Sequence, residues 1–127
     1  MSADTDLAAG QALRKQFDDA LDKASKKLGQ RLQWDEHELH ALTAACNAAD
    51  RRAELKQAFA AELAGDKRPA ILVKLSAELR LLDKAIVDHL SRIRIGTGVA
   101  KSERHQRAVN ARWRYRDEQR GIDGASS

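Results

Sequence analysis

Apolar side chains recur at intervals of three and four residues along most of the chain, the spacing that places them on one side of an α-helix. In the first segment these residues are Leu13, Phe17, Ala20, Leu21, Ala24 and Leu28. Lysines gather near the end of this segment, where they favour the negative end of a helix dipole, and Gly29 follows as a stop signal. The pattern predicts one amphipathic helix within residues 1–33.

A second helix is predicted to begin near Asp35 and to run to about residue 64. Asp35 can accept hydrogen bonds from the free N–H groups of the first turn, and Glu38, three residues later, completes a capping-box pattern. The first half of this helix presents mainly small side chains on its inner face, among them Ala45, Cys46, Ala49 and Ala53. Small side chains allow another helix to approach closely.

Residues 65–69, Gly-Asp-Lys-Arg-Pro, have the composition of a tight polar turn. Pro69 suits the first turn of a helix, because its missing N–H would have no partner there. The next helix is predicted to extend to about residue 95, and a short connection makes it antiparallel to the second, so residues 34–95 should form a long helical hairpin. Its apolar positions alternate by three and four: Leu72, Leu75, Leu79, Leu82, Ile86, Leu90 and Ile93. Because so long and narrow a stripe needs cover from other copies, we expect these seven residues to form an oligomer interface.

The composition is typical of an all-α protein. Much of the 43% hydrophobic content is alanine, with only two Trp, two Phe and one Tyr to fill a core. Cys46 is the only cysteine, which excludes an intrachain disulfide and a cysteine-based metal cluster. No apolar run approaches the length of a membrane span and residues 1–10 lack the basic start of a signal peptide, so a cytoplasmic location is expected.

The net charge of +4 is concentrated near the C-terminus. Residues 1–100 hold 16 Lys and Arg against 15 Asp and Glu, whereas residues 101–120 hold 7 against 3. A locally basic segment can neutralise phosphates or meet an acidic protein while the rest of the chain stays balanced. We therefore divide the chain into residues 1–33, the hairpin 34–95, a basic segment 96–120 and a short tail 121–127, which is expected to be disordered.

The basic segment starts with Gly96-Thr97-Gly98, an expected hinge, and continues as a weaker helix pattern toward Glu118. Arginine binds phosphate with a bidentate fork, and Trp113, Tyr115 and Asn110 can add stacking or hydrogen bonds. The predicted nucleic-acid-binding residues are Lys101, Arg104, Arg107, Arg112, Arg114 and Arg116. An equally open interpretation is a solvated basic helix that docks through Trp113 onto the body of the protein or onto an acidic partner.

The sequence predicts no catalytic site, bound metal or cofactor. His37 and His40 share a helical face beside Glu36 and Glu38, but one such pair is a weak metal signal, and a solvated helix start is the favoured interpretation. His89 falls at a hairpin position where a packed polar residue is expected. A phosphate-binding glycine loop and a nucleophile elbow are both missing from the sequence.

The stretch KRPAILVKLSAELRLLDKAIVDHLSRI (67–93), followed by SERHQRAVNARWRYR (102–116), resembles the small terminase subunit of tailed bacteriophages, especially those of actinobacterial hosts. The resemblance implies a non-enzymatic factor that forms a ring of identical subunits in the infected cell. Such a factor selects double-stranded viral DNA and regulates the large terminase subunit, an ATPase and nuclease. Many members of this family carry an N-terminal helix-turn-helix, whereas the 33 residues before Trp34 predict one long helix. DNA binding is therefore expected in the basic segment or on the ring surface.

A second hypothesis is a helical dimer that serves as a protein-interaction module, antitoxin-like or scaffold-like, whose basic tail captures an acidic protein. Native mass separates the two hypotheses, because a large closed assembly favours the terminase interpretation and a dimer or monomer favours the module.

Overall fold

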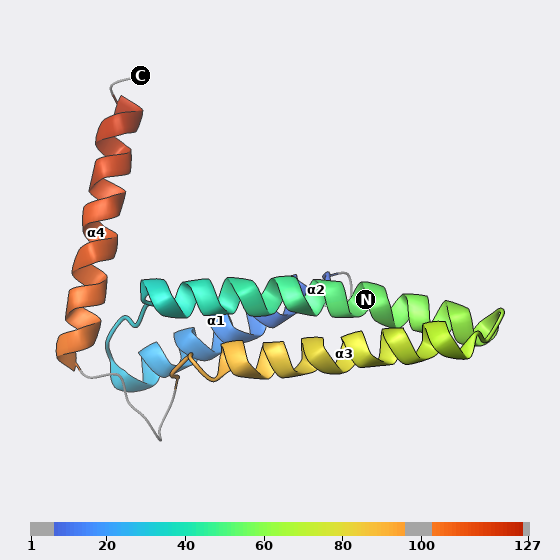
Figure 1. The fold of residues 1–127 in the computed structure, drawn as a ribbon. Helices are drawn as coiled ribbons and strands as arrows, with labels where there is room; N and C mark the ends of the chain where they lie inside the picture. The colour runs from blue at the N-terminus through green and yellow to red at the C-terminus, as the bar shows by residue number, and fades with distance from the viewer. Residues whose placement is uncertain (1–6, 96–102, 126–127) are drawn as a thin grey trace.

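The computed structural model describes residues 7–95 and 103–125, with the side chains of 7–95 and 106–119. It contains four helices: α1 (Ala9–Leu28), α2 (Glu36–Ala64), α3 (Pro69–Leu90) and α4 (Glu103–Ala125). Helices α2 and α3 pack lengthwise as an antiparallel hairpin, α1 lies against the first half of α2, and α4 stands away from the other three (Figure 1). The predicted all-α class and the central hairpin are confirmed.

The predicted C-terminal end of α1 and the predicted N-terminal start of α2 are both confirmed. α1 stops at Gly29, whose φ of 65° is left-handed and whose N–H donates to the Lys26 carbonyl. At the start of α2, the Asp35 carboxylate accepts from the backbone N–H of Glu38 at 2.7 Å, and the Glu38 carboxylate accepts from the Asp35 N–H at 3.2 Å. This reciprocal pair satisfies donors that the helix itself leaves unpaired.

The turn between α2 and α3 has the predicted form, with Pro69 as the first residue of α3. Lys67 adopts a left-handed φ of 53°, and its N–H donates to the Glu62 carbonyl at 2.9 Å. The buried Glu62 carboxylate also pairs with Nε of Arg68 at 2.6 Å. The same residue therefore holds both the backbone and a side chain of the turn, which offsets the unfavourable conformation of Lys67.

Helix α3 ends at Leu90, earlier than the predicted end near residue 95. The backbone N–H of Arg94 donates to the Glu38 carboxylate at 3.0 Å, which draws the chain back over the start of α2. Ile93 and Ile95 then pack against the core instead of continuing the helix. A long-range contact thus overrides the local helical pattern.

The hydrophobic core occupies one end of the molecule, where α1, the link at residues 29–35 and the start of α2 meet (Figure 1). The buried apolar residues among those described are Leu21, Leu32, Trp34, Ala41, Leu42, Ala45 and Val109. Beyond Ala45 and up to the end of α3, no apolar side chain is buried in the single chain. The far half of the hairpin is held only by the contact between its two helices.

Helix α1 crosses α2 at very short range near Gly10. The Gly10 N–H donates to the Asp50 carboxylate at 2.8 Å, so α2 caps the start of α1, where Ala8 offers no side-chain acceptor. A Cβ placed on Gly10 would lie 2.6 Å from the Cys46 carbonyl oxygen. The small residues on the inner face of α2 permit this close crossing.

Helix α4 extends to Ala125, past the end expected near Glu118. Residues 121–125 therefore belong to the helix, where a disordered tail was expected. Gln119 and Arg120 are good helix formers, and Gly121 and Gly124 each weaken a helix by only about 1 kcal/mol. The expected hinge at 96–98 lies outside the described residues.

None of the helices within residues 7–95 and 103–125 is both long enough and apolar enough to cross a bilayer.

Candidate nucleic-acid interface

Helix α4 is attached to the rest of the protein through one side of its first half. Three of its side chains donate to backbone carbonyls of the link: Gln106 to Gln33 at 3.2 Å, Asn110 to Arg31 at 3.0 Å and Trp113 to Trp34 at 2.7 Å. Val109 lies among them and is 1% exposed. Positions 106, 109, 110 and 113 share one side of a helix, so α4 contacts the body along a single narrow strip, the docking side.

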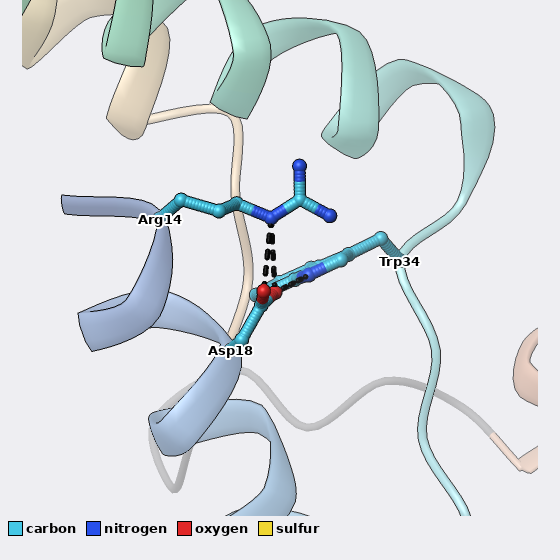
Figure 2. Close-up of polar contacts among 3 residues, drawn as sticks. All are labelled: Arg14, Asp18 and Trp34. Atoms are coloured by element: carbon cyan, nitrogen blue, oxygen red, sulfur yellow. Dashed lines mark hydrogen bonds and ion pairs between the residues drawn. The ribbon is translucent and has the colours of Figure 1, made fainter. Parts of the chain in front are cut away.

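The link that receives α4 is itself held by α1. The indole N–H of Trp34 donates to the Asp18 carboxylate at 2.9 Å, and Nε of Arg14 donates to the same carboxylate at 3.0 and 3.1 Å (Figure 2). Figure 2 shows the guanidinium and the indole approaching this carboxylate from different elements. Trp34 thus connects two helices, α1 through its side chain and α4 through its carbonyl.

Arg116 completes the attachment of α4. Its guanidinium forms an ion pair with Glu36, in the first turn of α2, and lies 4.9 Å from the centre of the Trp113 ring. A cation over an indole face is a favourable arrangement. Of the predicted DNA-binding arginines, Arg116 is therefore engaged within the chain, and its availability to phosphate depends on breaking a contact with Glu36.

The other predicted DNA-binding residues differ in where they lie. Arg107, Arg112 and Arg114 are exposed. Arg112 also borders the docking side of α4, because it lines a small pocket with Val109, Trp113 and Glu36. Lys101 and the side chain of Arg104 lie outside the described residues. Trp113 and Asn110 are used to attach α4 to the link, which agrees with the interpretation that the basic helix docks through Trp113 onto the body of the protein.

The seven predicted interface residues of the hairpin all lie on the partly buried side of the chain. Leu72, Leu75, Leu79, Leu82, Ile86, Leu90 and Ile93 are half-buried, because this is the side from which α3 packs against α2 and the core. The apolar side chains that remain most exposed are different ones, and on α3 they are Ile71, Val73, Leu81 and Val87. A second copy packed on α3 would therefore contact these exposed residues as well as the exposed parts of the seven half-buried ones.

The residues weighed for metal or redox chemistry do not come together as a metal site among the described residues. His37 and His40 are exposed on α2, and the described residues contain no cluster of three His, Cys, Asp or Glu side chains suited to a metal ion. Cys46 is half-buried and packs against the core. Burial raises the pKa of the Cys46 thiol, which the Arg14 charge partly opposes, so the thiol stays protonated near neutral pH.

An open groove of about 780 Å³ lies between α1, the link and α4. Its walls include Arg14, Asp18 and Trp34 on one side and Trp113 and Asp117 of α4 on the other. The groove marks the edge of the α4 attachment, and its charged groups are largely those that hold the link in place.

Two long-range contacts, one of α4 and one of the chain after α3, lack a clear signal in the sequence. Gln106 is fully buried although glutamine is mostly a surface residue, and Glu38 binds Arg94 in addition to its capping role. Only the spacing of Gln106, Val109, Asn110 and Trp113 by three and four could have indicated a docking side.

Comparison with known protein families, with curated proteins and with solved structures finds no match to this chain.

Proposed function

We propose that this protein is a phage terminase small subunit: a non-catalytic adaptor that recognises double-stranded viral DNA, assembles with copies of itself into a ring and regulates the large terminase subunit. The observation that carries the proposal is the attachment of α4. One side of this basic helix binds the body, and its remaining sides carry exposed arginines.

Duplex DNA is the partner that fits these arginines best. Arg107, Arg112 and Arg114 project from a helix that stands clear of the other three, so a large polyanion can approach without meeting the bundle. Binding of this kind depends on phosphate neutralisation and weakens steeply as salt rises. The concentrated charge of residues 101–120 supports the same conclusion independently of the fold.

Self-assembly is supported by the incomplete burial of the hairpin. No residue of α3 is buried in the single chain, and Val73, Leu81 and Val87 are 66%, 61% and 66% exposed. Large apolar side chains left in water on an otherwise thin hairpin favour cover by a second surface. Copies of the same chain, arranged in a closed ring, supply that surface by repetition.

The alternative, a dimeric interaction module whose basic helix captures an acidic protein, uses the same exposed surfaces. It differs in two measurable properties, which are the size of the assembly and the affinity for DNA.

The test combines native mass with DNA affinity. The wild-type protein should form a closed assembly larger than a dimer by light scattering and should bind duplex DNA with an affinity that falls steeply between 50 and 200 mM salt, by roughly 10³-fold or more for six to ten phosphate contacts. Arg107, Arg112 and Arg114, replaced together by alanine, should weaken binding at least tenfold without changing native mass.

The matched control removes three positive charges elsewhere, at the exposed Lys56, Lys74 and Arg80 of the hairpin. These substitutions should leave DNA affinity nearly unchanged if α4 makes the contact. A dimer that binds an acidic protein and shows no affinity for duplex DNA at low salt would replace the terminase proposal with the interaction module.

A further inference from the structure

Two flanks of the solvent side of α4 carry Arg107, Arg112 and Arg114, which are exposed. Relative to the docking side and at about 100° per residue, Arg107 and Arg114 fall on one flank, and Arg112 falls roughly 150° away on the other. A helix that lies across a phosphate backbone from outside needs its charges on one face only. Charges on both flanks instead match the two phosphate walls of a groove.

From Ala108 to Tyr115, the strip between these flanks carries no charged residue. Ala108 and Ala111 are exposed there, and Tyr115 follows at 64% exposed. Short side chains between flanking arginines allow the helix backbone to come close to a partner, and an exposed phenol can donate to a base edge or pack on a thymine methyl group. Glu118, one turn beyond, limits the favourable surface to the part of α4 before it.

The size and placement of α4 also suit a groove. An α-helix with its side chains is about 10–12 Å wide, and the major groove of B-DNA is about 12 Å wide. Figure 1 shows α4 at one end of the bundle, with its first half beside the link, so the side opposite the docking side faces away from the hairpin and can enter a groove.

We propose that α4 enters the major groove of duplex DNA as a recognition helix, with Ala108, Ala111 and Tyr115 toward the base edges and Arg107, Arg112 and Arg114 on the phosphates of the two walls. This inference rests on the proposed function, and it adds that DNA is contacted at the bases and not only along the backbone. The docking-side residues, including Asn110 and Trp113, take no part in base contacts because they hold the helix to the link.

The test compares two duplexes of identical sequence, one unmodified and one in which every cytosine carries a glucosyl group in the major groove. The phosphates are the same in both. The wild-type protein should bind the glucosylated duplex at least tenfold more weakly. Equal affinity for the two duplexes would overturn the recognition-helix proposal and leave DNA binding intact, whereas no affinity for the unmodified duplex at low salt would overturn the proposed function as well.

A second variant tests the strip itself. Ala108→Leu together with Ala111→Leu keeps every charge and a strong helix former, but fills the strip between the flanks. We expect at least a fivefold loss of affinity for the unmodified duplex at unchanged helix content. Ala12→Leu with Ala20→Leu, at exposed positions of α1, is the matched control and should bind as the wild type does. If the protein with Ala108→Leu and Ala111→Leu binds the unmodified duplex as tightly as the wild type does, the result contradicts a contact of α4 with the groove.

Discussion

At the scale of single residues, Gly10 shows how one missing side chain fixes the packing of two helices. The sequence places this glycine at the edge of a helical pattern, where it would ordinarily be interpreted as a break. In the structure it lies buried inside α1, donates to Asp50 and allows α1 to touch the backbone of α2 at Cys46. Gly10 matters because it has no side chain, and the spacing of hydrophobic residues along the sequence does not indicate how closely two helices approach.

Gly10→Ala should destabilise the protein by about 1–3 kcal/mol, the usual range for overpacking, even though alanine is intrinsically the better helix former by about 1 kcal/mol. The added Cβ would meet a backbone carbonyl at 2.6 Å, and a backbone atom cannot move aside without moving the helix. The free energy of unfolding in urea measures the change. Ala20→Gly, at an exposed site on the same helix, reports the helix preference alone and should cost about 1 kcal/mol. A Gly10→Ala protein as stable as the wild type would show that the crossing is looser than described.

At the scale of elements, the connection between α4 and the body depends on a few directed hydrogen bonds. The backbone carbonyl of Trp34 accepts from the Trp113 indole, and the side chain of Trp34 donates to Asp18. Since only Val109 and Gln106 of α4 are buried among its described side chains, little apolar area adds to these bonds. The orientation of α4 is therefore sensitive to the loss of one donor.

Trp113→Phe removes the indole N–H and keeps an aromatic ring. One hydrogen bond contributes about 0.5–1.5 kcal/mol, so the detached state of α4 should become roughly two- to tenfold more populated. Trypsin cleavage at the α4 arginines should accelerate by a similar factor, while the thermal unfolding of the α1–α2–α3 bundle changes little. Tyr115→Phe, which removes a hydroxyl from the solvent side, is the control and should be cleaved like the wild type. Equal cleavage of the Trp113→Phe and wild-type proteins would mean that the indole bond does not hold α4.

Sequence patterns predict the helices of this protein well because each helix has local signals at its ends. The Asp35–Glu38 capping box, Gly29 and Pro69 all act as predicted. The end of α3 was misjudged since it is set by Glu38, more than fifty residues away, through a bond to the Arg94 backbone. The candidate site was predicted in composition and in part in orientation: Trp113 docks onto the body, as one of the two open interpretations expected, whereas charge could not indicate that Gln106, Val109 and Asn110 face the body as well.

At the scale of the whole molecule, the buried apolar side chains are unevenly distributed. The core residues lie at the end where α1, the link and α4 attach, whereas the far half of the hairpin has two helices and no buried apolar side chain. The ion pair between Arg52 and Asp83 joins the two helices across this region but is partly exposed and so contributes little. A single subunit should therefore be locally least stable toward the Gly65 turn.

Amide hydrogen exchange should report this gradient and its dependence on assembly. In dilute protein, amides of residues 55–82 should exchange faster than those of residues 38–50, because their helices can open without exposing a buried core. Raising the concentration until the native mass reaches the assembled value should slow exchange at 55–82 selectively, since partner copies would then cover the apolar side chains. Residues 38–50 act as the internal reference, and their protection should change much less. Uniform protection of both segments in a dilute monomer would show that the hairpin is stable without partners, which removes the physical reason for self-assembly.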